Sequence, residues 1–515
     1  MSLAEQRAAA RHLSLLKPGL LALGFCLLAL AAAAWVATFI FDRVPHVEDD
    51  VAFLFQARTI ASGRLFLPIP PKPEFFDIPF TLQRDGLWFG KYPPGYPAVL
   101  ALGVLAGQPW LVEPVLGALA VGLTYLLGRR LYGAWTGLVG AALMTASPFF
   151  LLQAGSFMSH AACLFWATLF MLLFFGARER DSIPLAGAAG LALGMLFISR
   201  QLTAVGVAAP FALWALGELF VARRRFWLYL AMGVGFLPFA LGLLAYNAAT
   251  TGDPWRSAYE LYWAYDKLGF GPDYGVRGHY LADAVLNTRV NLEALTTYLF
   301  GWPGQSSLWP AMLAVAVATA GLLVGLAGHV GRRAAVARGL VPRGVDRPGL
   351  KPRAESTKPP AGGWERSQPA GRGDRPLAPT SARPCMAGRH GAGYDLLLAG
   401  VFVSLVVLHG AYWAFGQMYG PRYYFEALAA LTLLSARGLA LAAGALALGL
   451  RPLLGAGRAR AAALAAVAAL ALGLFAWATR TSCRPSSARR CAGTTSTTPA
   501  RERWRRPAST TPWSS

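Results

Sequence analysis

The sequence predicts an all-α integral membrane protein with about eleven transmembrane helices. Of its 515 residues, 55% are hydrophobic and only 14% are charged, whereas a soluble domain is about 25% charged. Uncharged apolar runs such as residues 20–40 and 226–249 reach the roughly 20 residues that a helix needs to cross a bilayer. With a mean hydropathy of +0.44, so long a chain cannot hide its apolar surface in one soluble core, and lipid is the expected solvent.

The predicted spans alternate across the membrane, starting from a cytoplasmic N-terminus. Lysine and arginine mark cytoplasmic loops, and the arginine clusters of this chain follow alternate spans. The same order of spans places both long polar loops on the outer side. The spans are expected at residues 18–40, 110–128, 134–154, 157–176, 184–199, 202–221, 226–249, 305–329, 394–416, 423–449 and 459–478.

Composition divides the chain into five parts. Two outer loops, residues 42–109 and 250–304, are expected to carry juxtamembrane helices. Two other stretches are rich in Arg, Pro, Gly or Ser and lack hydrophobic periodicity, which predicts disorder. The parts are a cytoplasmic N-terminus (1–17), a transmembrane core (18–330), a basic cytoplasmic linker (331–392), C-terminal transmembrane helices (393–478) and a basic tail (479–515).

The net charge of +22 does not indicate a nucleic-acid partner, because most of it lies in two irregular stretches. Residues 331–390 carry a net charge of +9 and residues 480–515 one of +7. Basic segments beside membrane spans set topology or contact anionic lipid. The five cysteines have neither metal-ligand nor CxxC spacing, so no zinc site and no disulfide framework is predicted. No cofactor is required by these patterns, and a divalent metal is left open.

The first outer loop opens with HVEDDVAFLFQA, in which Asp49 and Asp50 follow the first span. Acidic residues are common in the first turn of a helix, where they interact with free N–H groups and the helix dipole. The same place also suits a general base for an acceptor hydroxyl at the membrane surface. Farther along, GKYPPGYP holds Lys91 and Tyr92 in a turn stiffened by proline. Lys91 is there either a snorkelling lysine or a point charge for a phosphate.

Further polar residues stand at the outer ends of later spans. His160 opens the fourth span as a site group or a hydrogen-bonded core residue, and Arg200 ends the fifth span where topology requires no positive charge. Arg422 stands between Tyr419 and Tyr423 in YGPRYYFEAL, and a guanidinium can hold a phosphate through two hydrogen bonds. These residues are candidates for substrate binding.

The second outer loop is rich in Gly, Trp, Tyr and Asp. It begins with TGDPWRSAYELYWAYDKLGFGP, which includes Asp253. Aromatic residues are common in the interfacial belts of membrane proteins, so each one alone says little. Together with the ionisable residues of the loop they are candidates to line a sugar or acceptor pocket. These ionisable residues are Asp253, Asp266, Lys267, Arg277 and His279.

The ordered set of motifs resembles the GT-C membrane glycosyltransferases, specifically the branch of bacterial aminoarabinose transferase and the protein O-mannosyltransferases. The set comprises the acidic pair with VAFLFQA, the KYPPGYP turn, the SH pair at the fourth span, TGDPW and GFGP in the second loop, and YGPRYYFEAL before a late span. The resemblance covers residues 18–330 and 393–450. It implies the GT-C fold.

The resemblance implies an inverting transfer of a hexose or pentose from a polyprenyl-phosphate donor, at the outer face of the bacterial plasma membrane. Asp49 takes the position of the catalytic base. The usual acidic pair of the family is Asp-Glu, so Asp50 departs from the pattern and is assigned a supporting or acceptor-binding role. Lys91 matches the phosphate-contacting lysine of the family's turn, and Arg200 and Arg422 are placed to add positive charge for the leaving phosphate. The substrate-binding candidates are Tyr92, His160, Asp253, Tyr419 and Tyr423.

Two other functions stay open at this stage. A multi-pass transporter or flippase of a lipid-linked substrate tends to show inverted repeats and mid-membrane charges, whereas polar residues here gather in two loops on one side. A catalytically inactive GT-C scaffold is the other alternative, because of the Asp-Asp pair. The sequence specifies neither the sugar nor the acceptor, which is a lipid, a glycan or a protein.

Overall fold

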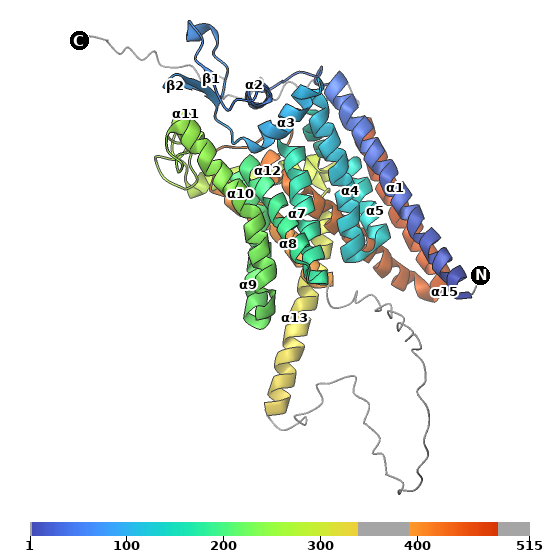
Figure 1. The fold of residues 1–515 in the computed structure, drawn as a ribbon. Coiled ribbons are helices and arrows are strands. Elements are labelled where there is room, and N and C mark those ends of the chain that lie inside the picture. The colour runs from blue at the N-terminus through green and yellow to red at the C-terminus, as the bar shows by residue number, and fades with distance from the viewer. Residues whose placement is uncertain (1–2, 338–390, 483–515) are drawn as a thin grey trace, which may run out of the picture.

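The computed structural model describes residues 3–337 and 391–482, which form a bundle of long helices with two loop regions at one end (Figure 1). Within these residues, eight helices are long and apolar enough to cross a membrane, or nine if one bent pair counts as a span. The predicted helical membrane fold is therefore confirmed. The eight helices are α1 (Leu3–Phe39), α4 (Val112–Tyr132), α7 (His160–Arg180), α9 (Gln201–Val221), α10 (Phe226–Thr251), α13 (Trp309–Ala337), α14 (Gly391–Gly410) and α15 (Leu428–Ser482).

The third predicted span is a bent pair of helices. It consists of α5 (Ala134–Thr145) and α6 (Pro148–Gly155), whose axes differ by 63°. The first residue of α6 is a proline, which has no N–H to continue the hydrogen bonds of α5. Ser147 caps the new helix, because its hydroxyl accepts a hydrogen bond from Phe150 N–H at 3.2 Å. The bend thus has a local cause in the sequence.

A second difference concerns the fifth predicted span. The helix α8 (Ile183–Ser199), at this position, has 17 residues, fewer than the roughly 20 that a bilayer requires. The last two predicted spans correspond to the two segments of α15, which meet at a kink at Gly455, where a φ of +75° interrupts the helical backbone. Glycine tolerates this left-handed conformation at little steric cost.

The predicted linker and tail both start too early. The helix α13 continues to Ala337, seven residues into the predicted linker (331–392), because the alanines and arginines there are good helix formers. The helix α15 likewise continues to Ser482, past the predicted start of the tail at residue 479. The remainders of both segments, residues 338–390 and 483–515, lie outside the described residues.

The first loop region, residues 42–109, contains two helices. It also contains a small sheet, which the sequence analysis did not predict. The helix α2 (Glu48–Ala61) follows α1, and α3 (Gly95–Leu105) has 11 residues. Asp85 and Gly86 have φ angles of +50° and +80°, as a two-residue hairpin turn requires. The antiparallel strands have the order β1-β3-β2 and are β1 (Leu67–Pro68), β2 (Thr81–Arg84) and β3 (Leu87–Gly90).

The second loop region, residues 250–304, contains α11 (Ala258–Tyr262) and α12 (Leu281–Tyr298). It touches the first: the Tyr262 hydroxyl accepts a hydrogen bond from Phe80 N–H at 3.3 Å, and the two ring centroids are 5.7 Å apart. Both loop regions therefore share one end of the bundle, as Figure 1 shows. Short 3₁₀ turns connect other elements: η1 (Pro73–Phe75), η2 (Pro109–Leu111), η3 (Arg223–Arg225), η4 (Pro303–Gln305) and η5 (Arg422–Ala427).

The opposite end of the bundle holds arginine–carboxylate pairs. Arg130, at the end of α4, is paired with Glu179 of α7 at 2.8 Å. Glu218 of α9 is paired with Arg178 of α7 and, at 3.0 Å, with Arg225. These pairs tie together the ends of helices α4, α7, α9 and α10.

Helices approach closely where glycine removes the side chain. A Cβ on Gly190 of α8 would lie 2.0 Å from the Met232 carbonyl oxygen of α10, and one on Gly235 would lie 2.2 Å from the Gly187 carbonyl oxygen. Small residues permit such contact between membrane helices, whose association depends on van der Waals packing because lipid is as apolar as the helix surface. Glycines on both helices thus allow α8 and α10 to pack in close contact.

The close contact predicts that Gly190→Ala destabilises the protein. The added methyl group has to push against backbone atoms, which costs about 1–3 kcal/mol, and the melting temperature in detergent should fall. Gly233→Ala is the matched control, because nothing lies within 4 Å of a Cβ at that position of α10. It should leave the melting temperature equal or slightly higher, since alanine favours helix over glycine. Equal melting temperatures for both variants and wild type would contradict the packing described here.

Candidate active site

The polar residues predicted for a site converge at the end of the bundle that carries the loop regions. Asp49 lies in the first turn of α2, and Lys91 and Tyr92 lie in the turn after β3. Arg200 lies at the break between α8 and α9, and Arg422 begins η5. The chain thus brings together side chains that are far apart in the sequence.

Asp49 is held as a carboxylate by two partners. The Tyr92 hydroxyl donates a hydrogen bond to its Oδ1 at 2.5 Å, and Arg422 Nη1 lies 3.5 Å from its Oδ2. Burial favours the neutral acid, but the Arg422 guanidinium, the Tyr92 hydroxyl and the Lys91 ammonium outweigh burial. The pKa of Asp49 therefore lies below its usual value. Asp49 is ionised and able to accept a proton.

Asp50 has the opposite environment, although it is the next residue. It is only 1% exposed, and its Oδ2 accepts a hydrogen bond from His46 N–H at 3.4 Å. Its Oδ1 has no hydrogen-bond partner in the described part of the chain. Burial raises the pKa of Asp50 to about 7, against the opposing effect of the His46 hydrogen bond, and the neighbouring Asp49 charge adds to the rise. The two carboxyl groups are thus tuned to different protonation states.

Arg422 is a buried guanidinium with unused donors. Its backbone N–H is fixed by the Gly416 and Gly420 carbonyl oxygens at 3.1 and 2.9 Å, and its Cζ lies 5.4 Å from the centroid of the Tyr423 ring. Among the described residues, neither its Nε nor its Nη1 donates a hydrogen bond. A buried donor without an acceptor is costly, so this arginine suits an anion with several oxygen atoms.

Arg200 has an extended backbone at the break between two helices, which points its side chain into the same region. Its Cζ lies 5.9 Å from the centroid of the Tyr423 ring, so both arginines lie near one tyrosine. Its Nη1 donates a hydrogen bond to Ser159 Oγ at 3.4 Å, and its Nε lies 3.8 Å from Glu426 Oε1. The same carboxylate oxygen lies 2.9 Å from His160 Nδ1. His160 is therefore a buried residue of this network.

Lys91 is enclosed by aromatic rings and is only 5% exposed, which excludes a snorkelling lysine. Its Nζ lies 3.9 Å from the Phe80 ring centroid and 4.4 Å from that of Trp263, and 3.9 Å from Asp266 Oδ2. Burial lowers the pKa of the Lys91 ammonium to about 8, against the raising effect of Asp266. Rings over a cation stabilise its charge. Three further rings within 5.4 Å are those of Tyr92, Tyr259 and Tyr262.

The other two predicted substrate-binding residues differ in their placement. Tyr419, in the segment before η5, packs against Phe41 with ring centroids 5.0 Å apart. Asp253 is exposed, and its Oδ1 accepts a hydrogen bond from Trp255 N–H at 2.9 Å in the turn after α10. The Asp253 side chain thus caps a turn, and the structure does not bring it to the cluster.

Two buried carboxylates near the cluster, Glu113 and Glu426, were not singled out from the sequence. Glu113 accepts hydrogen bonds from the N–H groups of Ala161 and Ala162, at 2.9 and 3.2 Å, at the start of α7. Glu426 and Asp266 pair with the cations described above. Glu113 and Glu426 interrupt the apolar stretches WLVEPV and YYFEAL, and an acidic residue within a membrane span is a signal of function. Asp266 lies in the second polar loop, where the sequence had nominated it among the residues expected to line a sugar or acceptor pocket.

Asp266 is anchored by the segment before η5. Its Oδ1 accepts hydrogen bonds from the Tyr412 hydroxyl at 2.6 Å and from Trp413 Nε1 at 2.9 Å. It therefore connects the second loop region both to Lys91 and to the C-terminal helices. Within residues 3–337 and 391–482 no three His, Cys, Asp or Glu side chains are grouped as metal ligands.

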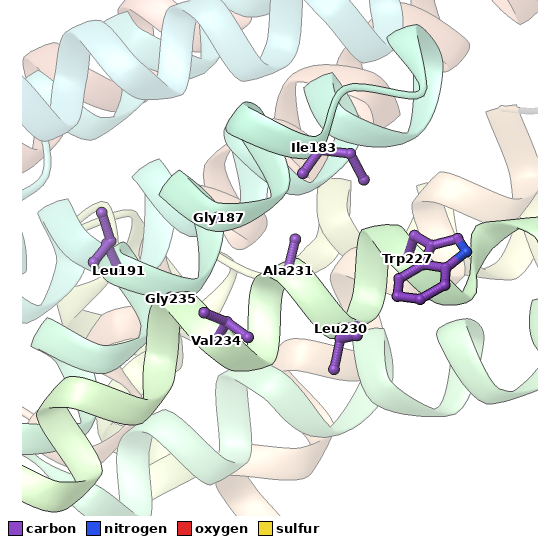
Figure 2. A pocket seen from close by; sticks show the side chains of 8 residues that line it. All are labelled: Ile183, Gly187, Leu191, Trp227, Leu230, Ala231, Val234 and Gly235. Atoms are coloured by element: carbon purple, nitrogen blue, oxygen red, sulfur yellow. The ribbon is translucent and has the colours of Figure 1, made fainter.

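A separate groove lies between α8 and α10 (Figure 2). Glycines and apolar side chains line it, including Ile183, Leu191, Trp227 and Val234. It contains no ionisable group and none of the candidate residues. The candidate residues therefore lie in the polar cluster and outside this groove.

Comparison with known proteins agrees with the predicted resemblance. Residues 97–244 match the family model described as dolichyl-phosphate-mannose-protein mannosyltransferase. The matched segment begins in α3 and ends in α10, and it includes His160 and Arg200. Among curated proteins, none matches this sequence.

A solved structure gives a second likeness. It is the crystal structure of the Archaeoglobus fulgidus oligosaccharyltransferase in the apo form, with a TM-score of 0.46 and 14% sequence identity. The match covers 95% of this chain and 59% of that one, so this chain spans about three-fifths of the length of the archaeal protein.

The class of protein follows from the family match together with the apolar helices. The chain is a multi-pass membrane protein, and its residues 97–244 are similar to the dolichyl-phosphate-mannose-protein mannosyltransferases, a family of GT-C membrane glycosyltransferases. The predicted family resemblance is confirmed.

The raised pKa of Asp50 predicts a pH-dependent difference between wild type and Asp50→Asn. An aspartate in an unfolded chain ionises near pH 3.9, whereas Asp50 in the fold ionises at about 7. Its contribution to stability is thus complete below about pH 4 and is lost as the pH rises toward 7. The melting temperature of Asp50→Asn, relative to wild type, should therefore increase between about pH 4.5 and 7.5.

The control for this measurement is Asp77→Asn. Asp77 is exposed in the first loop region, so its charge is solvated before and after unfolding. Its difference from wild type should stay constant with pH. A constant difference for Asp50→Asn as well would show that Asp50 is not a buried neutral acid.

Proposed function

We propose that this protein is an inverting glycosyltransferase that moves a sugar from a polyprenyl-phosphate donor to an acceptor hydroxyl at the outer face of the membrane. The family whose model matches is named for a lipid-phosphate-linked sugar donor. The acceptor is a lipid, a glycan or a protein. Membrane lipid surrounds the enzyme, and nucleic acid has no part in the reaction.

One observation carries the proposal. An ionised carboxylate, Asp49, forms an ion pair at 3.5 Å with a guanidinium, Arg422, whose Nε and Nη1 make no hydrogen bond among the described residues. A transfer from a sugar phosphate needs a base for the acceptor and a cation for the leaving phosphate. Asp49 and Arg422 supply this pair of functions side by side.

The bond changes balance with one base and one leaving group. The acceptor oxygen forms a bond to the anomeric carbon from the face opposite the phosphate, while its proton passes to Asp49. The bond between the anomeric carbon and the phosphate oxygen breaks, and the electron pair leaves with the polyprenyl phosphate. The configuration at the anomeric carbon is inverted. The phosphate departs as an anion, so no general acid is needed.

Three cations bind the leaving phosphate in this proposal, and they differ in how directly they reach it. Arg422 and Arg200 share one side of the cluster and hold the phosphate by charge-assisted hydrogen bonds. Lys91 is the third cation. Its ammonium has to leave the Asp266 carboxylate before it can bind the phosphate. The Tyr92 hydroxyl positions Asp49, and Asp50, His160, Tyr419 and Tyr423 surround the substrate. No cofactor is required, and a divalent metal remains compatible with the reaction.

The proposed orientation rests on the two ends of the bundle. The cluster lies at the end with the loop regions, and the arginine clusters of α4, α7 and η3 lie at the other end. Because positive charge favours the cytoplasmic side, the site faces outward and the N-terminus faces inward. The membrane would be the plasma membrane of a bacterium.

Asp49→Asn tests the base. A panel of polyprenyl-phosphate sugars is incubated with purified protein in liposomes, and the release of polyprenyl phosphate is measured. The variant keeps the shape of the side chain but removes the charge, so the rate should fall roughly 10²–10⁴-fold. Asp77→Asn is the control for an ordinary aspartate change and should retain the wild-type rate. Full activity of a folded Asp49→Asn protein would assign the base elsewhere, and no release by wild type from any donor would favour an inactive scaffold.

Tyr92→Phe tests whether the Tyr92 hydroxyl lowers the pKa of the Asp49 carboxyl. The hydroxyl of Tyr92 stabilises the ionised form of Asp49, so its loss should raise the pKa of that carboxyl. Since the base acts only when deprotonated, the acidic limb of the pH–rate profile should move to higher pH. An unmoved acidic limb would show that this hydrogen bond does not control the base.

A further inference from the structure

Glu426 is a buried carboxylate to which the proposed reaction gives no role. It lies on η5, four residues after Arg422, and is 0% exposed. Its Oε1 is 2.9 Å from His160 Nδ1 and 3.8 Å from Arg200 Nε. Its Oε2 has no hydrogen-bond partner within the described residues. Three separate segments of the chain therefore meet at this one carboxylate.

Each arginine of the site has its own carboxylate. Arg422 is paired with Asp49 at 3.5 Å, and Arg200 with Glu426 at 3.8 Å. Both guanidinium groups lie within 6 Å of the Tyr423 ring centroid, so two like charges are close together in a buried place. Charges interact strongly where water is excluded. The two carboxylates offset the repulsion between the arginines.

The pair between Arg200 and Glu426 is an ion pair without a hydrogen bond. Its 3.8 Å separation is longer than the 2.7–3.2 Å range of N–H···O bonds. Hydrogen bonds fix Glu426 to His160 and Arg200 to Ser159. The Nε of Arg200 donates its hydrogen bond to Thr203 Oγ1 at 3.4 Å. Glu426 therefore acts on Arg200 through its charge and not through a hydrogen bond.

We propose that Glu426 is a positioning residue that offsets the charge of Arg200 and thereby limits how tightly the site holds a phosphate. This inference rests on the proposed function, in which a lipid phosphate has to leave after each transfer. Binding a phosphate equally well before and after transfer does not speed the chemical step, and over-tight binding delays release. Glu426 acts through Arg200 and does not touch the reacting atoms.

The test is the affinity of purified protein for farnesyl phosphate, measured by calorimetry in detergent at about pH 8.5. Burial raises the pKa of Glu426 to about 7, against the lowering effect of Arg200, so the carboxylate is ionised at that pH. Glu426→Gln keeps the shape of the side chain and a partner for His160 but removes the charge. The dissociation constant should fall roughly tenfold, because an opposing charge near the phosphate is lost. Damage to the fold would weaken binding, so tighter binding is not a structural side effect. Glu426→Asp retains the charge and should stay within about twofold of wild type.

Asp395→Asn is the matched control. Asp395 is also a buried carboxylate beside an arginine, 3.9 Å from Arg437, but it belongs to the contact between α14 and α15. Its replacement should leave the affinity for farnesyl phosphate unchanged. Farnesol tests the chain without the phosphate, and inorganic phosphate tests the anion without the chain. Glu426→Gln should affect both phosphates and leave farnesol unaffected.

A double-mutant cycle identifies Arg200 as the intermediary. In an Arg200→Met background, Glu426→Gln should change the dissociation constant by less than about twofold. If the single Glu426→Gln protein does not fold, the dissociation constants of Arg200→Met and of the double variant are still compared. The double variant removes both buried charges together and so leaves neither charge unpaired. Unchanged or weaker binding in folded Glu426→Gln, or an equal effect without Arg200, would overturn the inference. Binding is measured without turnover, so an absence of glycosyl transfer would count against the proposed function and not against this role of Glu426.

Discussion

The ion pair between Asp49 and Arg422 is the interaction on which the site depends. It joins the first turn of α2 to η5, which leads into the last helices of the bundle. Burying two charges is costly unless pairing and hydrogen bonds compensate, and here Tyr92 donates the second bond to Asp49. The Tyr92 ring packs on Phe53 of α2 with centroids 4.3 Å apart. The ion pair between Asp49 and Arg422 thereby fixes the first loop region against the helix bundle.

Every other cation of the site follows the same rule, with a carboxylate from a different segment of the chain. Arg200 has Glu426, and Lys91 has Asp266, which is itself held by the segment before η5. A polar network of this kind is stable only when all its members are in place. The site is therefore pre-formed from five separated segments. The Nε and Nη1 of Arg422 make no hydrogen bond among the described residues, and the proposed phosphate site rests on these two donors.

The spans were predictable because run length and arginine position are properties of local sequence. Their count was not, because α6 begins after a proline bend and α8 has only 17 residues. The hairpin turn at Asp85 and Gly86 was also predictable, because an Asp-Gly pair between short apolar runs favours a two-residue hairpin turn. Asp49, Lys91, Arg200 and Arg422 were nominated one by one from motifs and resemblance. Their mutual distances, and the carboxylates that balance them, depend on tertiary contacts that no local pattern specifies.

The most direct test of this account is a structure of the chain in lipid nanodiscs with a non-hydrolysable polyprenyl-phosphate sugar analogue. The account predicts phosphate density against the unused Nε and Nη1 donors of Arg422 and beside Arg200. It also predicts that the anomeric carbon faces the side of the pocket where Asp49 meets an acceptor. Phosphate density at any other place, with the Asp49–Arg422 pair unchanged and its donors still empty, would contradict the central claim.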